Sequence, residues 1–322
     1  MRKMIHLGVM AIVAVAFIVP ICGAAHAAAP VDKMRVVLTN YSITLDSMIA
    51  HEKGYFKMLG LEIEPVSVKG GTATIISMIH SGNVDGCFLA SSGAFAAYTK
   101  GVKLVQVAGN GNLTFEFYAR KDSPIQSIAD FRGKKIANKP RPSGPWLSLR
   151  HDLDKFNIDA EVINVKTEDL ALSALLSGQV DVAVGESHFM PMYGDKIKLV
   201  HTSTISKYLF NSCGWWFKAD YAAKHPRAIK KYVAGLLLAR QFIRENREAA
   251  IRILARGTHL KLDDFKFKEA FVLPTFDMPT TIYKYGLDRM YAIFKHYKLM
   301  EGDVDVDSLI YDKASIIIDY DY

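Results

Sequence analysis

Three short stretches of glycine and hydroxyl residues stand where helix-like segments begin, and these residue types are suited to holding a polar ligand. They are Gly70-Gly71-Thr72, Ala90-Ser91-Ser92-Gly93 and Ser143-Gly144-Pro145. The first turn of a helix has unpaired backbone N–H groups and a partial positive charge, which suit an anionic or strongly polar group. Gly71 would let the backbone approach a ligand closely. Hydroxyl donors could come from Thr72, Ser91, Ser92 and Ser143. The alternative is that these hydroxyls only cap their own helices.

Motifs for catalysis or for metal binding are missing from the sequence. It contains no Gly-x-x-x-x-Gly-Lys-Ser/Thr phosphate loop and no Gly-x-Ser-x-Gly nucleophile elbow. Histidines at 51, 80, 151, 188 and 201 are scattered, without the spacing of metal ligands, and no Cys-x-x-Cys pair occurs. We therefore expect no catalytic residue, no metal site and no cofactor.

The elements that must position the helix starts alternate along the first two thirds of the chain. Strand-like runs cover residues 34–39, 61–68, 84–90, 103–109, 134–139, 160–165, 180–186 and 198–203, and helix-like runs cover 47–59, 73–79, 145–156 and 169–176. This alternation predicts an α/β protein whose mostly parallel sheets are flanked by helices. The last third, beginning with residues 225–256, has apolar residues at helical spacing and predicts further helices with solvated charged faces.

One corner of the sequence occurs twice. Residues 81–85 read Ser-Gly-Asn-Val-Asp and residues 177–181 read Ser-Gly-Gln-Val-Asp, each between a helix-like and a strand-like run. Gly-x-Val-Asp is a common turn, so the pair alone could be chance. Each corner also comes after a strand, a Gly-containing stretch and a helix start, which favours two similar α/β lobes facing each other across a ligand cleft.

The first 27 residues have the features of a secretory signal peptide. Arg2 and Lys3 precede an apolar run from Leu7 to Ile21, and Ala25-His26-Ala27 fits a cleavage site. The run is short for an uncleaved anchor, and a lipoprotein signal at Cys22 fits poorly after the bulky Ile21. We therefore expect an exported protein of about 295 residues, which is long enough for two domains; the family resemblance given below implies the periplasm as its location.

Charge and cysteine content add two further expectations. Losing Arg2 and Lys3 lowers the formal net charge by two, from +7 to +5, and the remaining charges of both signs are interspersed, so we expect no nucleic-acid partner. Cys87 and Cys213 each lie in an apolar strand-like run. They could pair in an oxidising compartment, but buried free thiols are favoured.

The ordered set of segments resembles the periplasmic solute-binding proteins of the NMT1/THI5-like group, which includes binding proteins for nitrate, taurine, other sulfonates and pyrimidines. The segments are HEKGYFKMLGLEIEPV, KGGTATIISMIHSGNVDGCF, SPIQSIADFRGKKIANKPRPSGPW, ALSALLSGQVDVAVGE and HPRAIKKYVAGLLLARQFIREN. The resemblance implies a type II periplasmic-binding fold in which residues 28–117 and 211–322 form lobe one, with the C-terminal helices, and residues 118–210 form lobe two. The crossings would lie at TFEFYARKD and LFNSCGWWFKAD.

The same resemblance implies a function, partners and further site residues. The expected protein is a monomeric receptor that captures a small organic solute, anionic or aromatic, by lobe closure and delivers it to the permease of an ABC importer. The predicted ligand-binding residues are Tyr41, Ser42, Gly71, Thr72, Ser91, Ser92, Asn110, Arg141, Ser143, Gly144, Trp146, Glu186, His188 and Trp215.

Several of these residues have a second interpretation. Arg141 could pair with an anion or be merely exposed, and Glu186 could accept hydrogen bonds from a ligand or form a salt bridge. Asn110 is equally ambiguous. Trp215 and Trp216 should point to opposite faces of a strand, and we expect one of them in the core. Aromatic residues near the crossings could line a ring pocket or belong to the core.

Two other functions stay open as alternatives. One is an enzyme related to the pyrimidine-precursor synthases, although the chain lacks the cysteine-rich segment that those proteins need. The other is a ligand-binding subunit that serves a sensor instead of a permease.

Overall fold

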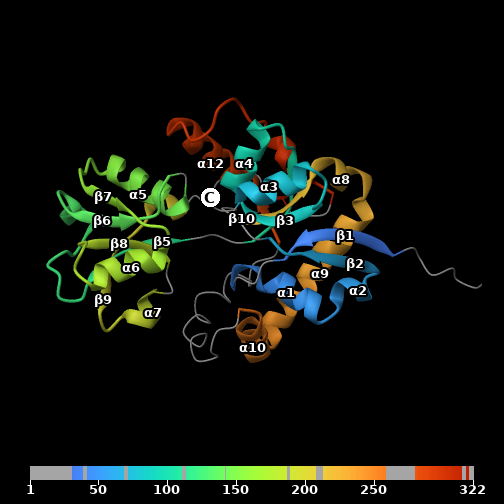
Figure 1. The fold of residues 1–322 in the computed structure, drawn as a ribbon, viewed down its shortest axis with the longest axis horizontal. Helices are drawn as coiled ribbons and strands as arrows, with labels where there is room; N and C mark the ends of the chain where they lie inside the picture. The colour runs from blue at the N-terminus through green and yellow to red at the C-terminus, as the bar shows by residue number, and fades with distance from the viewer. Residues whose placement is uncertain are drawn as a thin grey trace, which may run out of the picture. The chain divides into compact units, whose positions relative to one another are not determined.

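Two five-stranded sheets organise the part of the chain that the computed structural model describes (Figure 1). The described residues are 31–38, 42–68, 72–110, 114–141, 143–186, 189–207, 213–258, 280–313 and 317–318. The chain divides into two units, residues 1–30 and residues 31–322, and both sheets belong to the second unit. The predicted signal peptide, residues 1–27, lies outside the described residues.

The first sheet has the strand order β2-β1-β3-β10-β4. Its strands are β1 (Asp32–Val37), β2 (Leu61–Val66), β3 (Gly86–Ala90), β4 (Leu104–Gly109) and β10 (Cys213–Lys218). β1 is parallel to β2 and β3, and β10 is antiparallel to both β3 and β4. The carboxyl ends of β1, β3 and β4 therefore lie at one edge of this sheet.

Helices cover both faces of the first sheet, and together they form lobe one. On one face the core is shared with α1 (Leu45–Glu52), α2 (Tyr55–Met58), α9 (Pro226–Glu245) and α10 (Arg247–Thr258), and α8 (Ala219–Lys224) packs beside them. On the other face lie α3 (Thr72–His80), α4 (Ser91–Thr99) and α12 (Lys284–His296). The prediction that the C-terminal helices complete lobe one is confirmed.

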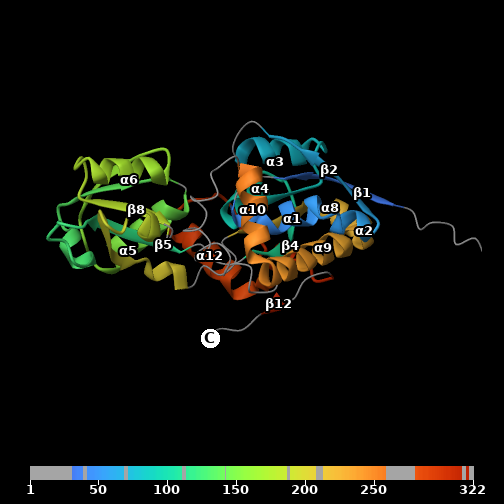
Figure 2. The same cartoon turned by 90° about the horizontal axis from the view of Figure 1, so that it is seen from below.

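The second sheet, with its helices, forms lobe two and has the order β7-β6-β8-β5-β9. Its strands are β5 (Phe115–Arg120), β6 (Lys135–Asn138), β7 (Glu161–Asn164), β8 (Val182–Glu186) and β9 (Ile197–Thr202). α5 (Gly144–Lys155) and α6 (Glu168–Leu176) lie on opposite sides of β8, as Figure 2 shows, and each has its own apolar core.

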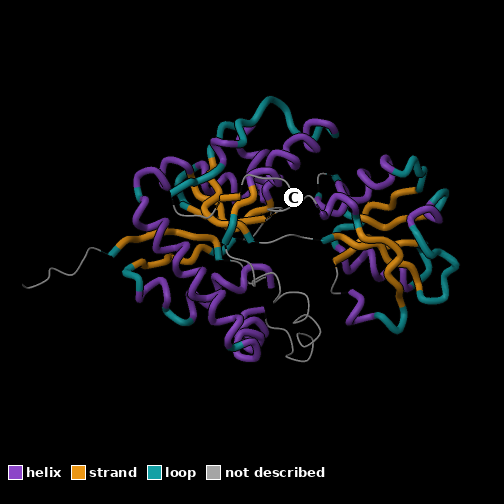
Figure 3. The backbone as a smooth tube through the Cα atoms, turned by 180° about the vertical axis from the view of Figure 1, so that it is seen from behind, coloured by secondary structure: helices purple, strands orange, loops and turns teal. Residues whose placement is uncertain are grey.

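Short elements complete the described chain. They are η1 (Ser42–Thr44), η2 (Ile128–Phe131), η3 (Thr204–Lys207), η5 (Asp307–Leu309), α7 (Phe189–Tyr193) and the strand pair β11 (Ile282–Tyr283) and β12 (Ile317–Ile318). In Figure 3 most of the strands gather in two groups with helices around each, so the prediction of two α/β lobes is confirmed.

The two sheets also have equivalent strand orders. β2, β1, β3, β10 and β4 correspond position by position to β7, β6, β8, β5 and β9, and the antiparallel strand takes the fourth place in both. The segments predicted as crossings, residues 114–122 and 209–220, mostly form these two antiparallel strands, β5 and β10. The lobe boundaries at residues 117/118 and 210/211 remain a prediction.

The repeated Ser-Gly-x-Val-Asp corner does the same work in both lobes. The backbone N–H of Asp85 donates to the Arg35 carbonyl at 2.9 Å, and its carboxylate accepts from the Arg35 N–H at 2.8 Å. The N–H of Asp181 donates to the Lys135 carbonyl at 2.9 Å, and its carboxylate accepts from the Lys135 N–H at 2.9 Å. Each corner therefore fixes the start of β3 or β8 to the strand beside it, at the sheet edge opposite to the carboxyl ends.

Candidate functional site: helix starts at the carboxyl edges and a groove between α3 and α4

The predicted helix starts are confirmed as positions in the fold. α3 begins at Thr72, α4 begins at Ser91 directly after β3, and α5 begins at Gly144. In open α/β sheets, ligands bind outside the carboxyl ends of the strands, where such helices start. Lobe one therefore presents the first turns of α3 and α4 at this edge, and lobe two presents the first turn of α5.

The first turns of α3 and α4 lie against each other. A Cβ atom added to Gly93 would come within 2.7 Å of the Thr72 Cγ2 atom, which is closer than real Cβ contacts. Glycine at position 93 therefore allows the two helix starts to approach. The partial positive charges of the two helix N-termini therefore lie close together, which favours an anion near them.

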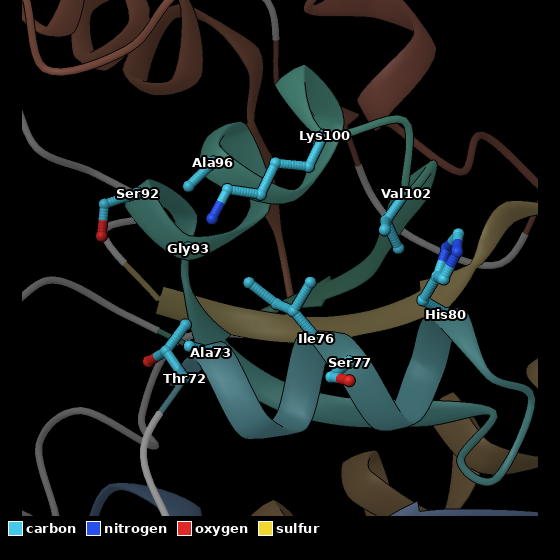
Figure 4. A pocket seen from close by; sticks show the side chains of 10 residues that line it. All are labelled: Thr72, Ala73, Ile76, Ser77, His80, Ser92, Gly93, Ala96, Lys100 and Val102. Atoms are coloured by element: carbon cyan, nitrogen blue, oxygen red, sulfur yellow. The ribbon is translucent and has the colours of Figure 1, made fainter.

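A groove of about 700 Å³ runs from these first turns along α3 and α4 (Figure 4). From α3 it is lined by Thr72, Ala73, Ile76, Ser77 and His80. From the α4 side it is lined by Ser92, Gly93, Ala96, Lys100 and Val102. Predicted residues Thr72 and Ser92 are brought together at one end of this groove, whereas the equally predicted Ser91 is fully buried and does not line it.

The polar groups of the groove are donors or cations. Figure 4 shows the Thr72 and Ser92 hydroxyls at the same end, with the Lys100 ammonium lying back along α4 towards them. The described residues that line the groove include no Asp or Glu. The groove thus combines an apolar floor with an electrostatic preference for negative charge.

In lobe two the start of α5 is packed more tightly. The Ser143 hydroxyl accepts a hydrogen bond from the Trp146 N–H at 3.2 Å, so it caps its own helix. A Cβ at Gly144 would lie 2.7 Å from the Phe115 ring, so glycine is needed for the close approach. Trp146 is half-buried and meets the Tyr297 ring edge-on, with centroids 5.8 Å apart.

Arg141 has protein partners. Its guanidinium donates to the backbone carbonyls of Tyr297 at 3.2 Å and Lys298 at 2.5 Å, just after α12. The Tyr297 hydroxyl in turn donates to the Asp154 carboxylate on α5 at 2.9 Å. Arg141 therefore ties the α5 start to the end of α12, and this contact competes with its predicted role as an anion partner.

Asn110 belongs to a buried network behind the edge of lobe one. Its side-chain amide donates to the Ile43 carbonyl, and its Oδ1 accepts from Arg240 at 2.9 Å. Arg240 also donates to Asp46 on α1 and to the Gly109 carbonyl. Burial raises the pKa of the Asp46 carboxyl, and the Arg240 charge opposes that rise. The nitrogen and the oxygen of the Asn110 amide are both hydrogen-bonded within the protein. Asn110 therefore positions the residues around the site.

The expectation for the paired tryptophans needs correction. We expected one of them in the core, but Trp215 and Trp216 are both fully buried. Trp215 packs edge-on against Phe88 and Tyr232, with centroids 5.4 and 5.5 Å away, so it is a core residue and not a wall of an open site. Both faces of this sheet carry helices, which is why both sides of β10 are buried.

The other predicted residues cannot be placed as side chains. Tyr41, Gly71 and His188 lie outside the described residues. Ser42 begins η1 and Glu186 ends β8, so their backbones lie at the two carboxyl edges, but their side chains are outside the description. Cys87 and Cys213 are buried and are not joined by a disulfide, as the sequence favoured.

Sequence reasoning missed two polar features of lobe two. Asn138, the last residue of β6, is fully buried, and its side-chain amide has no hydrogen-bond partner among the described residues. The sequence already contained a signal for this residue, because an asparagine at the end of an apolar strand, shortly before a helix start, indicates a polar position at the carboxyl edge. Its position at the carboxyl edge makes it a candidate ligand contact.

The second missed feature is a buried carboxylate. Asp152 of α5 lies 2.9 Å from His201 Nε2 and 3.0 Å from His151 Nδ1, and it accepts from the Thr204 N–H at 3.0 Å. Burial raises the pKa of this carboxyl, but the hydrogen bonds outweigh it and hold the pKa well below its usual value. Because His201 and Thr204 lie some 50 residues away in sequence, no local motif announces the cluster. It fixes α5 to the end of β9.

Among the described residues, no group of three or more His, Cys, Asp or Glu side chains could hold a metal ion. In the same part of the chain, no helix is both long enough and apolar enough to span a bilayer.

Comparison with solved structures identifies the fold as that of periplasmic binding proteins. A Candida albicans gene product described as having the generic periplasmic binding protein fold matches with a TM-score of 0.64 at 16% identity, covering 91% of this chain and 99% of that one. The periplasmic aliphatic sulphonate binding protein of Escherichia coli matches with a TM-score of 0.72 at 18% identity, covering 88% and 98%. The alkanesulfonate-binding protein of Xanthomonas axonopodis pv. citri, bound to MOPS, matches with a TM-score of 0.67 at 16% identity, covering 88% and 99%.

The sequence itself matches the family model described as NMT1/THI5 like over residues 45–250. The chain belongs to the NMT1/THI5-like family. Comparison with curated protein sequences found no match.

Proposed function

We propose that this protein is a periplasmic receptor that captures a small organic anion between its two lobes and delivers it to an ABC importer. The observation that carries the proposal is the pairing of the α3 and α4 first turns at the carboxyl edge of lobe one. Their closest approach is set by Gly93 and Thr72. The family membership and the two equivalent sheets support it.

The proposed contacts come from the positions of the predicted residues in the fold. Thr72 and Ser92 contribute hydroxyl donors from lobe one. Gly144, Trp146 and Asn138 contribute from lobe two, beside the start of α5. The lobe boundaries are proposed near residues 117/118 and 210/211, and export depends on the segment 1–27. Similar proteins include two whose names state that they bind sulfonates, which makes sulfonates the first class to test.

Within this proposal the protein binds its solute without transforming it. The donors at the groove can hold an anion through hydrogen bonds and charge. The buried Asp152 cluster is occupied by its own hydrogen bonds and serves to hold α5 in place.

A thermal-shift panel tests the receptor function. The mature chain, refolded to remove carried-over ligand, is heated with taurine, alkyl and aryl sulfonates, aromatic carboxylates, nitrate or pyrimidines. A specific ligand at 100 times its Kd stabilises the folded state by about 2.7 kcal/mol, which raises the midpoint by several degrees. A shift with one chemical class supports the proposal, and no shift with any member contradicts it for these classes.

Lobe closure can be followed through the intrinsic fluorescence of Trp146. Trp215 and Trp216 are fully buried, whereas Trp146 is half-buried and contacts Tyr297 at the end of α12. We expect the ligand to change the emission of the protein. The matched Trp146→Phe variant should lose most of that change, and a calorimetric titration of both proteins separates this loss of signal from any loss of affinity. An equal change in both proteins would contradict movement at this contact.

A further inference from the structure

The groove between α3 and α4 continues beyond the helix starts, and this continuation is the feature that the proposed function leaves unused. Its far part is formed by Ile76, Ala96 and Val102, and His80 stands at its end. From Thr72 to His80 the helix advances about 12 Å, at about 1.5 Å per residue. An extended chain advances about 1.2 Å per bond, so a chain of about eight to ten atoms would span this length.

We propose that the solute is an amphipathic anion whose charged head sits at the α3 and α4 first turns and whose apolar chain lies in this groove. The inference rests on the proposed function and names the class of its solute. The occupant of the groove is then the apolar chain of the solute and not a macromolecular partner.

Charge decides the direction in which the solute lies. The Thr72 and Ser92 hydroxyls and the Lys100 ammonium serve the end at which two helices begin. Within the described part of the chain, none of these three side chains forms a hydrogen bond or ion pair with another residue. An anionic head is therefore held at this end.

Shape decides which kind of chain can be attached to the head. Small residues at positions 73 and 96 leave space along the groove, and Ile76 and Val102 provide aliphatic walls. The Lys100 stem lies along the same groove, so its methylene groups can cover part of an apolar chain. A short anion such as nitrate would leave this surface unused.

The test is the dependence of affinity on chain length. Linear alkanesulfonates from two to ten carbons are titrated into the mature protein by calorimetry. A fully buried methylene contributes about 0.8 kcal/mol, which is about fourfold in Kd. Because the groove is partly open, we expect Kd to fall two- to fourfold per methylene up to about eight carbons and then to level off.

Two matched variants locate the tail. Ala96→Leu fills the middle of the groove, so the gain per methylene should fall below about 1.5-fold while the Kd for ethanesulfonate changes less than twofold. Thr74→Leu places the same side chain on an exposed position of α3 outside the groove and should leave the gain unchanged. Ile76→Ala removes a wall and should weaken only the longer ligands, and thermal midpoints verify that each variant is folded.

The outcomes separate this inference from the proposed function. Equal affinity for short and long alkanesulfonates, or a gain per methylene that survives Ala96→Leu, overturns the tail assignment and leaves the receptor function standing. Binding of nitrate or a pyrimidine with no binding of any alkanesulfonate also overturns it while keeping a receptor. Failure of every ligand class overturns both.

Discussion

The buried ion pair between Arg240 of α9 and Asp46 of α1 gives a sharp test of how lobe one is held together. The Arg240 side chain is 1% exposed and that of Asp46 is 0% exposed. Arg240→Met would remove the Arg240 donors from the Gly109 carbonyl and the Asn110 amide oxygen, and it would leave the buried Asp46 carboxylate without its cation, with the Ser47 N–H as a remaining donor. Removing one partner of a buried charge pair costs about 3–5 kcal/mol, and we expect a loss of that size in the free energy of unfolding.

The assay is urea unfolding of the mature chain, monitored by circular dichroism, for Arg240→Met, Asp46→Asn and the double variant. The double variant removes the uncompensated buried charge, so it should be at least about 1 kcal/mol more stable than Arg240→Met alone. The network also fixes Asn110 and the Ile43 carbonyl, so Arg240→Met should weaken ligand binding. A loss below about 1 kcal/mol, or a double variant no more stable than the single one, would refute the reasoning.

Three further predictions concern single positions. Hydrogen bonds hold the pKa of Asp152 below its unfolded value of 3.8, so its contribution is present above that pH and is lost as pH falls below it. Asp152→Asn should cost about 3 kcal/mol at pH 7 and progressively less towards pH 2, measured by urea unfolding; a pH-independent difference would contradict this. Gly93→Val should push the α3 and α4 starts apart at Thr72 and weaken solute binding at least tenfold by calorimetry, and an unchanged Kd would count against the paired helix starts. Asp85→Ala should destabilise more than Asp181→Ala by thermal unfolding, because Asp85 also binds the Arg35 side chain at 2.6 Å; equal losses would show that this ion pair adds nothing.

Much of the fold was predictable because its signals are local. Strand-like runs, turn glycines and helix spacing lie within a few residues of each other, and the repeated corner marked two equivalent sheets. The sequence indicated a strand at Trp215 and Trp216 in the second crossing segment, but it did not show which strands the two crossing segments pair with. Pairing of β5 with β9, or of β10 with β4, joins residues far apart in the chain, and no local pattern specifies such a partner.

The candidate site was only partly predictable for the same reason. Thr72 and Ser92 were found because helix starts have a recognisable composition. The second interpretation of Asn110 could not be specified because its hydrogen-bond partner, Arg240, lies 130 residues away. Trp215 was assigned to a pocket because side chains alternate between the two faces of a strand, and this alternation does not show whether a face is open or covered by a helix. Asn138 was overlooked, although a polar residue ending an apolar strand was visible.

The place of β10 in the first sheet has a consequence for the order in which the protein is assembled. Among the described strands of the first sheet, β4 is paired with β10, and β10 is synthesised after the whole of lobe two. Lobe two takes its five strands from one continuous stretch, residues 115–202, so it can fold as soon as that stretch is available. Pulse-labelled hydrogen exchange during refolding should accordingly protect β6 and β8 before β4, and simultaneous protection would contradict this order. Lobe two would thus fold before lobe one, because the sheet of lobe one is completed by β10, which follows β4 by some hundred residues.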